Sequence, residues 1–314
     1  MRFILSEKLT LFLIQCSVLL LQRADIDVSL KDAEGYTAFD VYNSTVAGTK
    51  PCETEFTDLY TWGTNRNAAL GVGDGDDRAF PELVPIPPQK DLANPSTLPL
   101  RSRFQPIRAK QVAMAKLHTA VVTSEPRANI RICGFGSGGR LGAGMGQHTQ
   151  YAFSTPKDLA SEAEIIAVAL GQDHTLALTS SGSVLSWGLA RFGQLGYPLD
   201  GGQTLQAAPR RIVGPLKKEI VVGVAACRTA SACWTRDEVF TWGTNSGQLG
   251  YDRAGAPVQV VPRRVTQISL PVIDLALSDA AMAVLLSTRD VHWFQIGRSF
   301  KIKYVFSAFP SFRT

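Results

Sequence analysis

The sequence repeats one short motif four times. A tryptophan, or in one copy a cysteine, precedes a glycine, and a Leu-Gly pair closes the turn that follows. The leading pairs are Trp62-Gly63, Cys133-Gly134, Trp187-Gly188 and Trp242-Gly243, and the closing pairs are Leu70-Gly71, Leu141-Gly142, Leu195-Gly196 and Leu249-Gly250. Successive leading residues stand 71, 54 and 55 positions apart (62 to 133, 133 to 187 and 187 to 242). Self-similarity of this kind indicates a chain built from repeated supersecondary units.

Short apolar runs lie between the motifs. They read HTAVVT from His118, HTLALT from His174, ASACWT from Ala230 and AMAVLL from Ala281. Further strand candidates are Ile165–Leu170, Ile220–Ala226 and Val272–Leu277. Short apolar runs bounded by Gly, Asp or Ser are typical of strands. Each repeat therefore offers about four strands in about 50 residues, which is the pattern of a β-propeller blade.

The tryptophan and the glycine of the motif each have a predicted structural role. We expect Trp242 to be a buried anchor on a strand near the propeller axis, because an aromatic side chain buries about 150–250 Å². Gly243 lacks a Cβ, so its backbone can take a positive φ or approach the adjoining blade. Leu249 is predicted to return the loop to the core, and Gly250 to end it.

Trp-Gly followed by Gly-Gln-Leu-Gly, with His-Thr opening the apolar run, resembles the repeat of the regulator of chromosome condensation. The resemblance covers residues 58–290. The segment LLLQRADIDVSLKDAEGYTAFDVYNS, residues 19–44, resembles the end of one ankyrin repeat and the start of the next, with Thr37 as a helix cap. The predicted fold is mainly β, a partial β-propeller of about four blades plus a fragment, with a short α-helical ankyrin-like N-terminal segment.

The order of these segments narrows the resemblance. Strings such as KDAEGYTAFDV, DLYTWGTNRNAALGVGD and WTRDEVFTWGTNSGQLG are similar to the inhibitor of Bruton tyrosine kinase family. That family combines ankyrin repeats, this propeller and BTB domains, and its members are substrate adaptors of a cullin-based ubiquitin ligase. The resemblance implies a non-enzymatic protein-interaction scaffold, here a fragment without the BTB part. Its implied partners are proteins, with a small GTPase or a ubiquitin ligase subunit as candidates.

The predicted domain boundaries follow from these repeats. An ankyrin-repeat remnant is expected at 1–48, a linker at 49–57 and propeller repeats at 58–290. The individual repeats are predicted at 58–124, 130–182, 183–238 and 239–290. Residues 291–314 are interpreted as an incomplete fifth repeat or a tail foreign to the fold. A partial ring is expected to expose unpaired strand edges and to be poorly soluble.

Charge and cysteine content bear on partners and compartment. The net charge is +5, of which residues 291–314 carry +4, so the repeats give no strong sign of a nucleic-acid surface. Five cysteines, an odd number without metal-ligand spacing, favour a reducing compartment, cytoplasmic or possibly nuclear. The apolar run Leu9–Leu21 is too short to span a membrane; it is either an ankyrin helix or the core of a signal peptide. If residues 1–23 are a signal peptide, the alternative is a secreted propeller.

Three motifs suggest chemistry, and each has a simpler structural interpretation. Gly134, Gly136 and Gly139 spell GxGxxG, but a blade turn is favoured because no helix start follows. GDGDD at Gly73–Asp77 lacks the spacing of a calcium loop and is interpreted as a solvated loop. His118 and His174 occupy equivalent places in successive repeats, so they are expected to lie apart and to bond neighbouring backbone.

The sequence predicts no catalytic, cofactor-binding or metal-binding residues, and no enzyme. Guanine-nucleotide exchange or a chromatin-associated role, as in the founding member of the repeat family, is the alternative function. The proline-rich insertion Glu82–Pro106 is predicted to be a loop, either a partner-binding loop or an unconstrained insertion.

Overall fold

The computed structural model describes residues 58–84, 86, 107–146, 149–159 and 163–302. The chain divides into two units, Met1–Glu55 and Phe56–Thr314, and all described residues belong to the second. The predicted ankyrin remnant at 1–48, the linker at 49–57 and the run Leu9–Leu21 lie outside the described residues.

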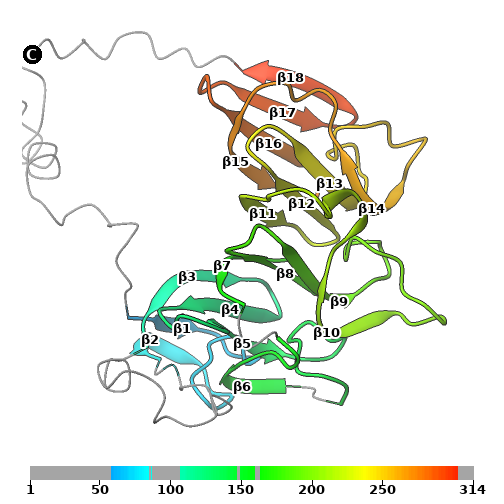
Figure 1. Ribbon diagram of the computed structural model, residues 1–314. Coiled ribbons are helices and arrows are strands. Elements are labelled where there is room, and N and C mark those ends of the chain that lie inside the picture. Colours follow the sequence, from blue (N-terminus) through cyan, green and yellow to red (C-terminus); the bar gives the residue numbers. More distant parts are fainter. Residues whose placement is uncertain (1–57, 85, 87–106, 147–148, 160–162, 303–314) are drawn as a thin grey trace, which may run out of the picture. The chain divides into compact units, whose positions relative to one another are not determined.

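The described residues form five antiparallel sheets that follow one another along the chain (Figure 1). The first has two strands, β1 (Tyr60–Gly63) and β2 (Arg78–Leu83). The second has β3 (Ala109–Met114), β4 (His118–Thr123), β5 (Ile130–Phe135) and β6 (Thr149–Ser154). The third has β7 (Ile165–Leu170), β8 (His174–Thr179), β9 (Val184–Leu189) and β10 (Leu205–Arg211).

A single short helix, η2 (Gly214–Leu216), precedes the fourth sheet in the described part of the chain. That sheet has β11 (Gly223–Ala226), β12 (Ala230–Trp234), β13 (Val239–Thr244) and β14 (Val258–Arg264). The fifth has β15 (Val272–Leu277), β16 (Ala281–Leu286), β17 (Val291–Gln295) and β18 (Arg298–Ile302). Four four-stranded sheets and one half sheet confirm the predicted mainly β, partial propeller fold.

Neighbouring sheets meet through their first strands. β7 contacts both β3 and β11, and β11 contacts β15. The strand that carries the Trp-Gly step is the third of its sheet, since β9 holds Trp187 and β13 holds Trp242. We expected this strand to lie near the propeller axis, but the main strand-to-strand contacts between neighbouring sheets all involve a first strand rather than a third.

The sequence repeats are offset from the sheets by two strands. A repeat counted from one Trp-Gly strand, such as 183–238, supplies β9 and β10 to the third sheet and β11 and β12 to the fourth. At the end of the described chain, Val291–Gln295 and Arg298–Ile302 complete the fifth sheet as β17 and β18. This part of the predicted fifth repeat or foreign tail therefore belongs to the fold, and residues 303–314 lie outside the described residues.

The second strand of each interior sheet is covered on both faces. All six residues of β4, all six of β8 and all five of β12 are buried. Alternate residues face opposite neighbours, so Val121 packs toward the first sheet and Val122 toward the third. These strands therefore read as continuous apolar runs, as strands buried on both faces do.

The indole N–H of the repeated tryptophan joins neighbouring sheets. Trp187 Nε1 donates to the main-chain oxygen of Arg140, 2.9 Å away in the turn of the preceding sheet. Trp242 Nε1 donates in the same way to the Gln194 oxygen at 2.8 Å. Both side chains are fully buried, as predicted, and their N–H groups find partners as buried donors must.

The glycine after the tryptophan is required within its own sheet. Gly243 has a φ of 101°, and a Cβ there would lie 2.5 Å from the Thr229 oxygen and 2.6 Å from Ala230 Cα. Both atoms lie beside the start of β12, the neighbouring strand of the same sheet. The predicted positive φ is confirmed, but the close approach is to the sheet's own strand rather than to the adjoining blade.

The first and last interfaces use different residues at these positions. At the first, the Ala69 oxygen accepts the Thr119 hydroxyl at 2.6 Å and the Cys133 thiol at 3.6 Å. At the last, Met282 stands where the other sheets have a threonine or serine, and Phe294 stands where they have the motif tryptophan or cysteine. Both Met282 and Phe294 are buried. The interface between the fourth and fifth sheets is therefore apolar at these positions.

The half sheet β1–β2 presents aromatic and aliphatic side chains to solvent. Its exposed large apolar residues are Tyr60, Trp62, Phe80 and Leu83. Trp62 is 61% exposed although it belongs to the same motif as the buried tryptophans. Within the described residues β1 and β2 pair only with each other, whereas the other sheets have four strands each. No helix among the described residues has the length and apolar character that a membrane crossing needs.

Candidate functional site

Four equivalent loops connect the first and second strands of the complete sheets. Each is closed by a main-chain hydrogen bond of 2.8–2.9 Å from its first residue to its last. The loops are Ala115–His118, Gly171–His174, Cys227–Ala230 and Ser278–Ala281. Because the first strands contact one another, the second residues of these loops, which we call the loop tips, come together. The tips are Lys116, Gln172, Arg228 and Asp279.

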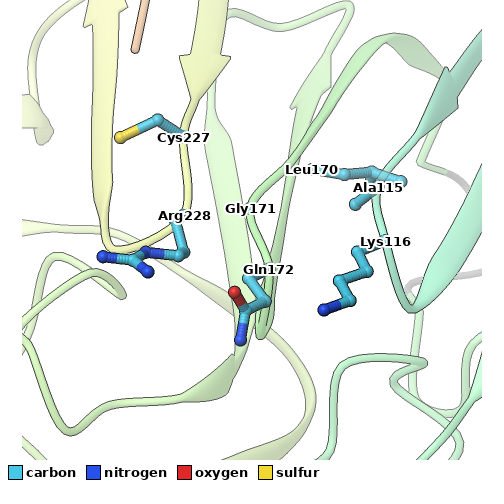
Figure 2. Close-up of a pocket in the computed structure, with 7 residues that line it drawn as sticks. All are labelled: Ala115, Lys116, Leu170, Gly171, Gln172, Cys227 and Arg228. Carbon is cyan, nitrogen blue, oxygen red and sulfur yellow. The ribbon is translucent and has the colours of Figure 1, made fainter. Parts of the chain in front are cut away.

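Three of the four loop tips line a pocket of about 230 Å³, the loop-tip pocket (Figure 2). Lys116, Gln172 and Arg228 supply its polar groups, each from a different sheet. The rest of the lining is Ala115, Leu170, Gly171 and Cys227. In Figure 2 the Lys116 ammonium and the Gln172 amide extend into the same region, and the Arg228 guanidinium points away from them.

Hydrogen bonds fix the backbones of the three tips. The Gln172 N–H donates to the Arg228 oxygen at 3.4 Å, and the Arg228 N–H donates to Asp279 Oδ1 at 3.1 Å. On the other side, the Asn67 amide donates to the Lys116 oxygen at 2.9 Å from the turn of the half sheet. The pocket is thus lined by loops of three sheets, and hydrogen bonds from the half sheet and from the fifth sheet hold these loops in place before any ligand arrives.

The charge of the pocket is positive by one unit. Arg228 forms an exposed ion pair with Asp279 at 3.3 Å, which offsets its charge. Lys116 is exposed and has no ion-pair partner in the described part of the chain. Burial raises the pKa of the Cys227 thiol to about 12, so this cysteine is uncharged at neutral pH and is a poor nucleophile.

Gly171 lines the pocket, and its Cα lies close against the His174 ring. A Cβ at Gly171 would lie 2.0 Å from His174 Cε1, 2.2 Å from its Nδ1 and 2.6 Å from the Cys227 oxygen. The imidazole therefore fills the space that any larger residue at position 171 would need.

The two predicted histidines do not form a catalytic pair. His118 Nε2 lies 2.9 Å from Thr175 Oγ1, and His174 Nε2 lies 2.8 Å from Ser231 Oγ. Each histidine thus bonds a hydroxyl of the next sheet, and the expectation that it would bond backbone is wrong. The histidines lie in different sheets, as predicted, and both are fully buried.

The hydrogen bonds of the Thr175 and Ser231 hydroxyls determine which ring nitrogen of each histidine carries the proton. Each hydroxyl donates its one proton to the main-chain oxygen that also accepts the indole N–H, so the imidazole Nε2 must be the donor. Nδ1 is then unprotonated, and in both rings it has no hydrogen-bond partner among the described residues. Burial lowers the pKa of His118 and of His174 to about 3. A neutral histidine that donates to a hydroxyl acts as a link between sheets, not as a general base.

The glycine-rich and acid-rich motifs form turns. Gly134 is the next-to-last residue of β5, and the Gly139 N–H donates to the Gly136 oxygen at 3.1 Å within the turn that follows. No helix begins there, which confirms the blade-turn interpretation. In GDGDD, Asp74 accepts a hydrogen bond from Arg78 at 2.7 Å, which lowers the pKa of its carboxyl. Asp77 accepts the Asn65 N–H at 2.7 Å.

No group of three or more His, Cys, Asp or Glu side chains is placed to hold a metal ion in the described part of the chain. The insertion predicted as a loop from Glu82 to Pro106 begins differently, because Glu82 and Leu83 belong to β2. Residues 87–106 lie outside the described residues, so the two interpretations of this insertion stay open predictions.

The pocket residues were not singled out by the sequence. A signal for them exists, since Lys116, Gln172 and Arg228 each stand two positions before the start of an apolar run. The signal is weak because the three side chains differ from repeat to repeat.

Comparison with known proteins agrees with the repeat and the fold. Two family models described as "Regulator of chromosome condensation (RCC1) repeat" match residues 165–194 and 181–234. The BTB/POZ domain-containing protein 1 of Schizosaccharomyces pombe is 32% identical over 270 residues, which cover 83% of this chain and 19% of that protein. The inhibitor of Bruton tyrosine kinase of Homo sapiens is 33% identical over 279 residues, which cover 85% of this chain and 19% of that protein.

Among solved structures, yeast RCC1 (Prp20), bound to Kap60, matches with a TM-score of 0.60 at 18% identity. The match covers 76% of this chain and 52% of that one. At this identity the likeness concerns the fold alone. The chain spans about a fifth of the length of the curated relatives it matches.

Proposed function

Because this chain carries regulator of chromosome condensation (RCC1) repeats and is homologous to the inhibitor of Bruton tyrosine kinase, we propose that it is a protein-interaction propeller. Its role would be to hold substrate proteins for a cullin-type ubiquitin ligase. The observation that supports this most is the similarity to an inhibitor of Bruton tyrosine kinase over 85% of this chain. A relative of similar identity carries a BTB/POZ domain in its name.

The arrangement of the described residues is consistent with binding rather than turnover. The two histidines are buried links between sheets, and the accessible polar groups gather at the loop-tip pocket. An open polar site at the junction of several sheets is accessible to a segment of another protein.

Affinity capture followed by a turnover measurement tests the proposal. The tagged chain should retain a small set of proteins that a structurally unrelated protein of equal net charge does not retain. Raising the level of this chain in cells should change the half-life of a retained protein, because the chain competes for or delivers it. Retention without any change in half-life would contradict the adaptor role, and the absence of specific retention would contradict the interaction role itself. Stimulated nucleotide release from a small GTPase would favour the exchange alternative.

A further inference from the structure

We propose that the loop-tip pocket binds the carboxylate of an acidic segment in the partner protein. This inference rests on the proposed interaction function and names the chemistry of the partner. It comes from a pocket whose lining joins loop tips of three sheets, and into which the Lys116 ammonium and the Gln172 amide both extend (Figure 2).

The polar groups of the pocket are mainly hydrogen-bond donors. Lys116 offers an ammonium, and Gln172 offers the amide N–H that remains beside its 3.4 Å bond to Asp173 Oδ2. The Arg228 guanidinium points away from both and contributes positive charge at the rim (Figure 2). An ionised carboxylate only accepts hydrogen bonds, and its bonds to charged donors are stronger than those between neutral groups. A carboxylate placed beside Gln172 would therefore find a cation and an amide donor already present.

The charge of the site matches a singly charged anion. Lys116 and Arg228 contribute two positive charges and Asp279 removes one. The next acid, Asp173, is already held by Arg140 at 2.5 Å, so it neither adds nor removes net charge. A partner with one carboxylate at this point neutralises the pocket, whereas a dense run of phosphates would meet the Asp279 carboxylate.

The pocket has room for a side chain, and its lining favours a side chain over a nucleobase. A volume of about 230 Å³ is room for several water molecules at about 30 Å³ each, and hence for one Glu or Asp side chain. Single-stranded nucleic acid is usually held by bases stacked on aromatic rings, and the pocket lining has no aromatic residue.

Binding at the pocket has to order the exposed Lys116 and Arg228 side chains, but not the backbones that carry them. All three tips have fixed backbones, through the main-chain bond from Gln172 to Arg228, the bond from Arg228 to Asp279, and the amide of Asn67 on Lys116. Preorganised donors lose less entropy on binding than mobile ones do.

Fluorescence anisotropy with a labelled oligoglutamate peptide tests the assignment. The test variant is Lys116→Gln with Arg228→Gln, and the control is Lys217→Gln with Lys218→Gln, which removes the same charge from an exposed segment elsewhere. We expect the test variant to bind the peptide on the order of tenfold more weakly, and the control to bind like the wild type. Binding should weaken as salt rises, because exposed charges are screened.

Three outcomes would overturn the assignment. Equal weakening in both variants would show that only net charge matters. No weakening in the test variant would show that the peptide binds elsewhere. A single-stranded DNA oligonucleotide that binds the pocket more tightly than the peptide would show that its ligand is a nucleic acid. Melting temperatures of both variants, expected to equal that of the wild type, establish that each is folded.

The same variants separate this inference from the proposed function. If wild type and test variant retain the same proteins in affinity capture, the interaction role stands and the acidic-segment assignment is wrong. If the pocket binds the peptide but the chain retains no specific protein, the pocket assignment stands and the proposed function is wrong.

Discussion

Trp242 and Trp62 belong to the same motif but have opposite surroundings. Trp242 is fully buried and donates to a carbonyl of the preceding sheet, whereas Trp62 is 61% exposed. Trp62 lies on the half sheet, before which the structure describes no further sheet. The burial of the motif tryptophan is therefore a property of the interface between two sheets, and a repeat alone does not provide it.

The interfaces themselves differ in polarity. Those between the second, third and fourth sheets combine histidine, hydroxyl and indole groups around one carbonyl. The last interface has Ala230, Met282 and Phe294 at the corresponding positions. The same packing of sheets thus tolerates both kinds of junction. The first pairs its buried hydroxyl, indole and imidazole N–H groups and, of these side chains, leaves only the histidine Nδ1 atoms without a partner among the described residues, and the second has apolar side chains at these positions.

The largest expected difference between the two regions is in stability. Trp242→Ala should lower the free energy of unfolding by about 3–5 kcal/mol, because it leaves a cavity between two sheets. Trp242→Phe should cost about 1–3 kcal/mol, since it mainly removes the indole donor while Ser231 still bonds the Gln194 oxygen. Urea denaturation measures both, and a loss under about 1 kcal/mol for Trp242→Ala would contradict a core role.

The hydrogen-bonded interfaces should also be sensitive to acid. His118 and His174 have pKa values lowered by burial to about 3, so they stay neutral in the folded state while the unfolded state takes up protons below about pH 6.5. Their contribution to stability is complete above pH 6.5 and is lost as the pH falls toward 3. The two together should cost about 2–3 kcal/mol per pH unit in that window.

Urea midpoints measured between pH 7 and pH 5 check this expectation. His118→Gln with His174→Gln keeps hydrogen-bond donors at both positions but removes the titrating groups. The double variant should show a flatter pH dependence than the wild type, and identical slopes would show that these histidines are not responsible.

The smallest expected effect is at the half sheet. Trp62→Ala should change stability by less than about 0.5 kcal/mol, because the side chain is mostly exposed. The same change should reduce self-association, since Trp62 forms an exposed apolar group with Tyr60, Phe80 and Leu83. Sedimentation velocity at several concentrations measures the second effect, and a stability loss above about 1 kcal/mol would mean that a partner sheet covers Trp62.

Much of the fold could be predicted because strand and turn signals are local. The strands that begin at His118 and His174 coincide with the predicted apolar runs, and the glycine turns lie where the motif places them. The role of Trp242 in joining two sheets was not predictable, because its acceptor, the Gln194 oxygen, lies 48 residues away and is a main-chain atom.

The candidate site was harder to predict than the fold. Lys116, Gln172 and Arg228 are chemically different, and each belongs to a separate repeat. Only the contacts between the first strands of neighbouring sheets bring their loops to one pocket. Sequence periodicity identifies equivalent positions, but it does not say which of them converge.

The offset between repeats and sheets has a consequence for gain and loss of repeats. Excising residues 183–238 would remove β9 and β10 from one blade and β11 and β12 from the next. The survivors, β7 with β8 and β13 with β14, are an inner and an outer pair whose free edges are complementary. An internal deletion of one whole repeat can therefore be accommodated by a hybrid blade, built from the inner pair of one sheet and the outer pair of the next.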